Sequence, residues 1–386
     1  MMADHAPLAP SAAARWVVCP GSVRLEAEAP LPVIEDHAKA AAWGDAAHWF
    51  AASILTLDAS VNFLNQKAPN GVIADDEMIE AVQMYVDDVR GLLDAGQIPA
   101  VEGLIKIPSV HADNWGSPDC WIFNPAAMRG GILRLWDFKG GHRFVEAFEN
   151  WQLIDYAIGI LDLICAEHEF DRANITVEMT VVQPRSFHPA GPIRRWLVNA
   201  PDLDDYQLRL LGAAANALSD TPGFAASPEC RDCKGRHRCA TLHAAAQAAM
   251  DISTRSTSVD LDAAALGLEL RSMRRAAELL AAKITGLEAV AETRLRTGER
   301  IPHFHLAQNQ SREQWAMDAA TVLATGDALG VKLAKEPAPI TPGQARKALK
   351  AAGMGEALLD GFTERPPGAM KLAEINDTLA RKVFGA

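Results

Sequence analysis

Apolar positions in the first ninety residues recur at helical spacing. Over residues 34–57 they line one side of a helical projection, which predicts a helix with one buried face. A second helix is predicted from about Asp75 to Leu93, because acidic residues at its start suit the positive end of a helix dipole. Residues 11–30 predict a short helix and a turn at Cys19. The N-terminal quarter is therefore expected to be helical.

After residue 100 the apolar positions begin to alternate, which is typical of strands. The turn residues Asn124-Pro125 and Gly130-Gly131 separate two of these segments. The predicted elements are strands at Val101–Ile107, Cys120–Phe123 and Ile132–Phe138, a helix at Ala147–Ile164, strands at Asn174–Gln183 and Ile193–Val198, and a helix at Asp202–Leu218. This order predicts an α/β fold with a mixed central sheet flanked by helices.

The remaining sequence is rich in alanine and leucine and then in proline. Residues 246–300 predict a long helix or a helical hairpin, and residues 301–386 predict a small accessory domain interrupted by prolines. Residues 1–245 would form the core domain.

Composition narrows the class of protein. The chain has 386 residues, of which 49% are hydrophobic, so it can bury a large core. It contains neither a bilayer-spanning apolar run nor a secretory signal, and we expect a soluble cytoplasmic protein that does not bind membranes. The six cysteines are then expected to be reduced. The net charge of −12 disfavours nucleic acid as a partner, but local clusters of arginine and lysine could still bind phosphates.

Two acids and a lysine form the first candidate site. Asp119 follows the turn Gly116-Ser-Pro, while Asp137 and Lys139 occupy alternate positions of a predicted strand and so face the same way. Burying these charges would be costly unless they are paired or bind a metal ion. Carboxylate oxygens suit Mg²⁺ or Mn²⁺, and the lysine could contact a phosphate or an attacking water. An exposed Asp–Lys pair is the alternative.

Neighbouring helices add three polar candidates. Gln152 and Tyr156 are four residues apart on a predicted helix, so both could contact a DNA backbone or position Lys139. His48 lies four residues after Gly44 and could supply an imidazole ligand. Glu102 is a further acid without a motif to define its role. Ordinary packed or surface residues would show the same spacings.

Four cysteines form the second candidate site, which we call the cysteine cluster: Cys19, Cys230, Cys233 and Cys239. The pair Cys230 and Cys233 has metal-ligand spacing. From spacing alone, a local zinc site that includes His237 and His243 is as good an interpretation as an iron–sulfur cluster. A centre that includes Cys19 would connect segments on either side of the acids and the lysine.

These motifs together resemble those of the RecB-type PD-(D/E)XK nucleases. The matching segments, in order, are Gly44-Asp-Ala-Ala-His48, Gly116-Ser-Pro-Asp119, Asp137-Phe-Lys139 and Gln152-Leu-Ile-Asp-Tyr156. With cysteines before and after them, they resemble the iron–sulfur branch that includes AddB and CRISPR-associated RecB-like exonucleases. The closest resemblance is to phage and prophage RecB-like proteins known as a domain of unknown function. It is specific over about residues 11–245 and weak beyond.

The resemblance implies a role for each matching position. His48, Asp119 and Asp137 would bind Mg²⁺ or Mn²⁺, Lys139 would be the catalytic lysine, and Gln152 and Tyr156 would assist it. The cysteine cluster would hold a [4Fe–4S] cluster, and this order of motifs favours iron–sulfur over zinc. Asp45 departs from the usual threonine, and Asp137 from the usual glutamate.

The implied function is a metal-dependent deoxyribonuclease. We expect an exonuclease in phage recombination or DNA processing, acting on single- or double-stranded ends in a bacterial or phage-infected cell. A single-strand annealing or binding protein is a candidate partner, and a homo-oligomer is compatible with the sequence. The alternatives are a non-catalytic DNA-binding or assembly protein on the same core, and a redox-sensing iron–sulfur protein that binds DNA.

Overall fold

The computed structural model describes residues 6–31, 35–57, 63–126, 130–168, 170–253 and 260–307. By its internal contacts, the chain divides into one unit of residues 1–305 with 377–386 and a second of residues 306–376. The accessory domain predicted over 301–386 falls almost entirely outside the described residues.

The described N-terminal residues form the α-helices α1 (Ala13–Val18), α2 (Gly21–Glu28), α3 (Glu35–Leu57) and α4 (Asp76–Arg90). Helix α4 begins where the side chain of Asp75 accepts a hydrogen bond of 2.8 Å from the backbone N–H of Met78. The helical expectation for this part is confirmed, because both longer helices lie within about three residues of their predicted bounds.

A mixed five-stranded sheet forms the centre, in the order β1-β4-β5-β6-β7. Its strands are β1 (Ala100–Val101), β4 (Cys120–Ala126), β5 (Gly130–Phe138), β6 (Ile175–Val182) and β7 (Ile193–Asn199). Strands β5 and β6 are parallel and are connected through α5 (Trp151–His168), whereas the other neighbouring pairs are antiparallel. The predicted mixed α/β class is confirmed.

The single strand predicted at Val101–Ile107 is wrong. The chain leaves the central sheet after Val101, because Glu102 adopts a left-handed conformation with φ 51°. It then enters β2 (Ile105–Lys106), which pairs with β3 (Trp115–Gly116) in a separate two-stranded sheet. This turn places Glu102 at the end of β1 rather than within a strand.

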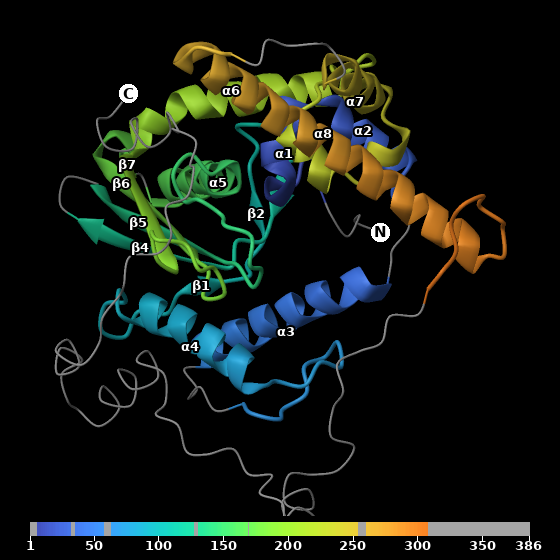
Figure 1. Cartoon of the computed structure of the whole chain (residues 1–386). Helices are drawn as coiled ribbons and strands as arrows, with labels where there is room; N and C mark the ends of the chain where they lie inside the picture. The colour runs from blue at the N-terminus through green and yellow to red at the C-terminus, as the bar shows by residue number, and fades with distance from the viewer. Residues whose placement is uncertain are drawn as a thin grey trace, which may run out of the picture. The chain divides into compact units, whose positions relative to one another are not determined.

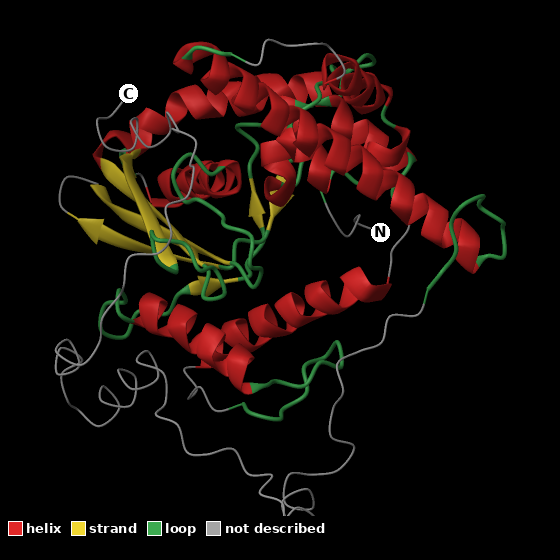
Figure 2. Cartoon of the chain, viewed as in Figure 1, coloured by secondary structure: helices red, strands yellow, loops and turns green. Residues whose placement is uncertain are grey.

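Helices cover both faces of the central sheet (Figures 1 and 2). On β5, Leu133 and Leu135 face the core that includes α5, whereas Trp136 and Phe138 face the core formed with α3 and α4. Asp137 is two residues after Leu135 on β5, so both side chains lie on the same face of the sheet, the one that α5 covers.

Antiparallel pairing brings three chain segments to one edge of the sheet, where β1 and β5 end and β4 begins. Val101 at the end of β1 pairs with Cys120 at the start of β4, and Cys120 pairs with Trp136 near the end of β5. Glu102, Asp119 and Asp137, each within one residue of these partners, therefore converge there although they are far apart in sequence.

The chain continues through α6 (Asp204–Ala217), α7 (Ala240–Ser253) and α8 (Ala263–Arg296). Helices α7 and α8 pack against each other, and Leu242, Leu279 and Ala282 form a small core with Cys230. Within the described residues, none of the helices is both long and apolar enough to cross a bilayer.

Candidate metal-binding site

Three side chains meet at this sheet edge with ligand atoms within 4.8 Å of one another: His48 from α3, Glu102 after β1 and Asp119 before β4. His48 Nδ1 lies 3.4 Å from Asp119 Oδ1 and 3.8 Å from Glu102 Oε1. The ring of His48 packs edge-on against Phe138, with 5.3 Å between ring centroids. Two carboxylates and an imidazole thus surround one position.

Asp137 and Lys139 lie beside this group and form a triangle with Gln152. Lys139 Nζ is 2.9 Å from Asp137 Oδ1 and donates to Gln152 Oε1 at 3.0 Å. Gln152 Nε2 in turn donates to Asp137 Oδ1 at 3.0 Å. Helix α5 presents Gln152 here because Asn150 Oδ1 accepts from the backbone N–H of Gln152 at the start of the helix.

One buried oxygen indicates that this site fits a cation. Asp137 is 3% exposed, and its Oδ2 has no hydrogen-bond partner within the described part of the chain. A buried carboxylate oxygen without a partner is unfavourable by about 1–3 kcal/mol. The nearby donor set, carboxylates with one imidazole, suits Mg²⁺ or Mn²⁺. Asp137 would complete the coordination from outside the tighter group of His48, Glu102 and Asp119.

The carboxylates increase the proton affinity of the site. Burial alone would lower the pKa of His48, but the charges of Asp119 and Glu102 raise it to about 9. Burial and the charge of Asp119 raise the pKa of Glu102 to about 7. Burial also raises the pKa of Asp137, although Lys139 opposes this effect. A divalent cation would therefore compete with bound protons.

Asp119 remains ionised because several partners outweigh its burial. Burial raises the pKa of Asp119, but the charges of His48 and Lys139 lower it by more, so the net shift of the pKa is downward. The backbone N–H of Phe138 also donates to Asp119 Oδ2 at 2.6 Å. Its other oxygen, Oδ1, faces His48.

Tyr156 supports the turn before Asp119. It is 6% exposed, and its hydroxyl donates to the carbonyl of Ser117 at 3.1 Å. A Cβ atom on Gly116 would lie 2.8 Å from this hydroxyl and 3.2 Å from Pro10, so the close approach requires glycine. Of the two helical candidates, Gln152 contacts Lys139, whereas Tyr156 is buried and does not face open solvent.

The loop after Lys139 is fixed against α3 and the β6–β7 connection. A Cβ on Gly140 would lie 3.0 Å from the Trp43 ring. Gln183 Nε2 donates to the carbonyl of Gly141 at 2.8 Å, and Arg185 donates to that of Gly140 at 3.1 Å. No sequence motif indicates that Gln183 contributes to this part of the structure.

Several arginines in this region form ion pairs or hydrogen bonds within the fold. Arg185 pairs with Glu77 at 2.8 Å and lies over the Trp43 ring. Arg194 is 2% exposed and donates to Gln183 Oε1. Arg134 and Arg195 both pair with Glu178. By contrast, the cysteine segment keeps exposed cations at Arg231, Lys234 and Arg238.

The four residues of the cysteine cluster line one small pocket between α1–α2 and the segment before α7. Three sulfurs accept backbone N–H groups at 3.4 Å: Cys19 from Ala225, Cys230 from Ser227 and Cys239 from Leu242. Burial raises the pKa of the Cys19 and Cys230 thiols, and that of Cys233 to about 12. Bound metal would favour the thiolates against this burial.

The residues around this pocket can be compared with the ligand set of a zinc site. A tetrahedral zinc ion with bonds of about 2.3 Å holds its sulfurs about 3.8 Å apart. Within the described residues, the ligand atoms that lie within 4.8 Å of one another in groups of three or more are those of His48, Glu102 and Asp119, not the cysteine sulfurs. The lining of the pocket also excludes His237 and His243. The four cysteines line this pocket together, whereas the two histidines of the local zinc interpretation do not.

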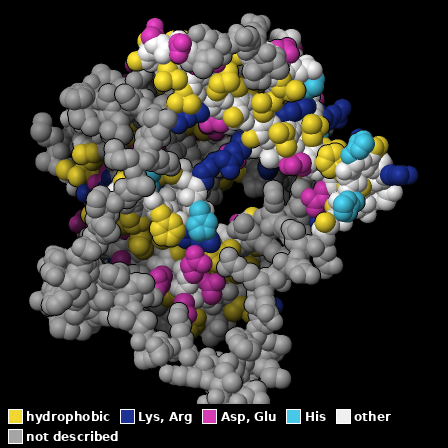
Figure 3. All heavy atoms as spheres, viewed as in Figure 1, with side chains coloured by type: hydrophobic (Ala, Val, Ile, Leu, Met, Phe, Trp, Pro, Cys, Tyr) yellow, Lys and Arg dark blue, Asp and Glu magenta, His cyan; other side chains and the backbone are white. Residues whose placement is uncertain are grey.

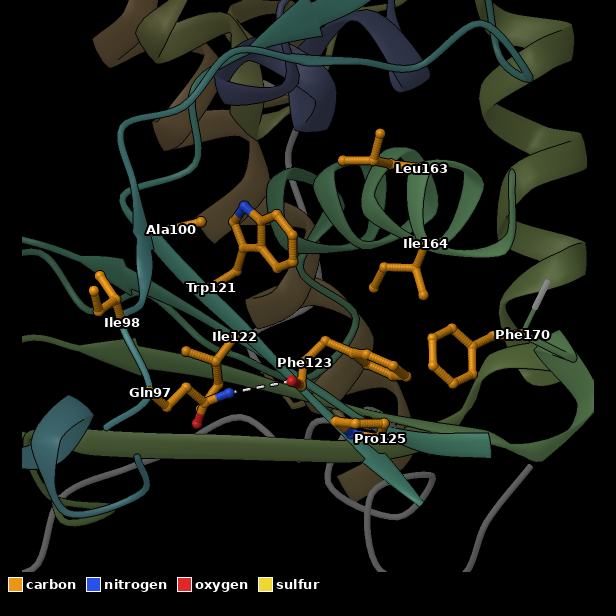
Figure 4. Close-up of a pocket in the computed structure, with 10 residues that line it drawn as sticks. All are labelled: Gln97, Ile98, Ala100, Trp121, Ile122, Phe123, Pro125, Leu163, Ile164 and Phe170. Carbon is orange, nitrogen blue, oxygen red and sulfur yellow. Dashed lines mark hydrogen bonds between the residues drawn. The ribbon is translucent and has the colours of Figure 1, made fainter. Parts of the chain in front are cut away.

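A separate pocket of about 440 Å³ lies between β4 and α5 (Figure 4). Trp121, Phe123, Leu163 and Phe170 contribute to its apolar lining, and Gln97 Nε2 donates to the carbonyl of Phe123 at 3.1 Å. The residues that line it include no acid, histidine or cysteine, so it has no groups for hydrolysis.

One family accounts for nearly the whole sequence. Residues 5–380 match the family described as "Protein of unknown function (DUF2800)". The chain belongs to this family. Its description assigns no activity, so a function has to be argued from the geometry above.

Proposed function

We propose that this DUF2800 protein is a metal-dependent deoxyribonuclease with a RecB-like PD-(D/E)XK core. The observation that carries the proposal is the buried, unpartnered Asp137 Oδ2 beside Lys139, at the edge where His48, Glu102 and Asp119 meet. Hard oxygen ligands for a divalent cation, next to a fixed ammonium group, can support metal-assisted phosphodiester hydrolysis. The strand–helix–strand arrangement of β5, α5 and β6 supports the same assignment.

The residues divide the chemistry between them. His48, Glu102, Asp119 and Asp137 would hold Mg²⁺ or Mn²⁺, which supplies an activated water and neutralises negative charge on the phosphate. Lys139 directs its ammonium toward the reacting phosphate and compensates charge that develops there. Gln152 holds Lys139 through the hydrogen bond of 3.0 Å. Tyr156 and Gly116 fix the turn from which Asp119 projects.

The cysteine cluster would hold a [4Fe–4S] centre with a structural role. Four cysteines that line one pocket without His237 or His243, and backbone N–H donors to three of the sulfurs, support this choice. The cysteine segment also contacts the loop after Lys139, because Arg143 pairs with Asp232 at 2.7 Å. Loss of the centre would therefore disturb the loop that follows Lys139.

The test is a cleavage time course on end-labelled DNA with Mn²⁺. We expect degradation of linear DNA, no cutting of closed circular DNA, and a loss of at least about 100-fold in rate for Lys139→Ala. Lys106→Ala on β2 is the matched control, because Lys106 is exposed and outside the site. Circular dichroism would show that each variant folds.

Two results would overturn the assignment. Cleavage by folded Lys139→Ala at the wild-type rate would remove the lysine from the mechanism. DNA binding without cleavage under Mg²⁺ or Mn²⁺ would instead support a non-catalytic DNA-binding protein.

A further inference from the structure

A groove of about 760 Å³ opens directly onto the candidate metal-binding site. It shares His48, Glu102 and Asp119 with that site and extends along α3 past Trp49, Ser53 and Leu57. A volume of this size is typical of pockets that accept small organic molecules, and it is large enough for a nucleoside. A strand whose phosphate lies at the metal site would place its neighbouring nucleoside in or beside this groove.

The charge of the groove selects which part of a nucleotide it accepts. Its described lining contains the acids Asp45, Glu102 and Asp119 but neither lysine nor arginine. Figure 3 shows acidic side chains gathered over the region of α3 and α4, with histidine and basic side chains next to them. A phosphate away from the metal would be repelled, whereas an uncharged base and sugar would not.

Trp49 provides a surface for that base. Its side chain is 43% exposed, although tryptophan is usually well buried. The ring is held in place by edge-on contact with Phe50, at 5.0 Å between centroids, and Phe50 stacks on Phe63 in the core. A fixed aromatic ring that is open to solvent is suited to stacking with a nucleobase.

Resting on the proposed nuclease function, we propose that this groove is a subsite for one unpaired nucleobase next to the scissile phosphate, with Trp49 as its stacking partner. A base within a duplex already stacks on its neighbours, so it would have to leave the helix to reach Trp49. The substrate is therefore a single strand or a frayed end, and Trp49 is a specificity residue.

The test scans a labelled single-stranded oligonucleotide with one abasic site moved along it. Binding is measured by fluorescence anisotropy with Ca²⁺ in place of Mn²⁺, so that cleavage is not needed. We expect one abasic position to weaken wild-type binding about tenfold, which is within the range for one stacked base. In Trp49→Ala this position should no longer matter, and the intact strand should bind about tenfold more weakly.

Two variants make the result specific. Trp49→Phe should restore most of the positional effect. Phe187→Ala is the matched control, because it removes a ring that is 96% exposed and not part of the groove lining; it should keep the wild-type pattern. A blunt duplex with the same abasic site should show no dependence on Trp49.

Several outcomes would overturn the proposal. They are an absence of any sensitive position, persistence of the effect in Trp49→Ala, or loss of the pattern in Phe187→Ala. A positional pattern without cleavage in Mn²⁺ would retain the subsite and reject the nuclease. Cleavage without a positional pattern would retain the nuclease and reject the subsite. An absence of DNA binding would overturn both the nuclease and the subsite.

Discussion

Gln152 accepts a hydrogen bond from Lys139 at 3.0 Å, so a residue near the start of α5 fixes the ammonium group at the end of β5. Its amide nitrogen binds Asp137 at the same time. Gln152 is therefore a positioning residue that acts through both members of the pair.

Gln152→Met should lower kcat roughly tenfold and change KM little, because the lysine is misplaced but DNA contacts remain. The matched control is Gln97→Met, which removes an amide that binds the carbonyl of Phe123 and is not part of the Asp137–Lys139–Gln152 triangle. Steady-state cleavage assays would separate kcat from KM. Equal losses in the two variants would refute a positioning role.

Gly116→Ala should destabilise the protein by about 1–3 kcal/mol, because the added methyl group would overlap the Tyr156 hydroxyl. Tyr156→Phe alone should cost about 1 kcal/mol through loss of the bond to Ser117. Combined, the two changes should cost less than their sum, because removal of the hydroxyl makes room for the methyl group. Urea denaturation of the four proteins would measure this coupling, and strict additivity would contradict it.

Glu102→Gln should weaken Mn²⁺ binding about tenfold, because one anionic ligand is lost beside His48 and Asp119. Isothermal titration with Mn²⁺ in the absence of DNA would measure the change. Glu149→Gln is a suitable control, because Glu149 also has a positive φ but its partner is Tyr206. Unchanged affinity in the Glu102 variant would exclude it as a ligand.

Asp155 should make stability depend on pH. Burial raises its pKa to about 8, although the hydrogen bond from Asn114 opposes this. The folded state therefore keeps a proton that the unfolded chain loses near pH 4, and the stability from this group falls as pH rises from about 4 to about 8. Asp155→Asn should flatten this dependence and raise the melting temperature at pH 8 relative to wild type.

Melting curves between about pH 4 and about pH 8, the interval over which this contribution changes, would measure the difference. The exposed Asp205→Asn serves as control, since it replaces an acid on the surface of α6. Parallel curves for wild type and Asp155→Asn would contradict the assignment.

Cys19→Ala should lower both iron content and soluble yield, because it removes one ligand and the link between α1 and the segment before α7. Metal and sulfide analysis of protein purified without oxygen would measure it. Cys165→Ala, outside the cluster, should behave like wild type. Normal iron in the Cys19 variant would exclude this ligand, and stoichiometric zinc without sulfide would replace the iron–sulfur assignment.

Local periodicity was enough to predict much of the fold. Alternation on β5 placed Asp137 and Lys139 on one face, and they lie 2.9 Å apart. Helical spacing likewise predicted α3 and α5. These predictions succeeded because the pattern of buried positions depends directly on the repeat of each element.

Contacts between distant segments could not be predicted in this way. Glu102 reaches His48 because a glutamate adopts φ 51°, which ordinary propensity does not indicate. Tyr156 shares a helical face with Gln152, yet its partner Ser117 is 39 residues earlier and is fixed by packing at Gly116. Gln183 organises the loop after Lys139 through backbone carbonyls, which leave no trace in sequence.

The hydrogen bond from Ala225 to Cys19 spans 206 positions of the chain. During synthesis, α1 and α2 must wait for this partner until Ala225 and the remaining cysteines have left the ribosome. The acids, the histidine and the lysine emerge earlier, so the newly made chain would carry these groups before the segment that packs against α1 and α2. Helix α8, which packs against the cysteine segment, would emerge later still.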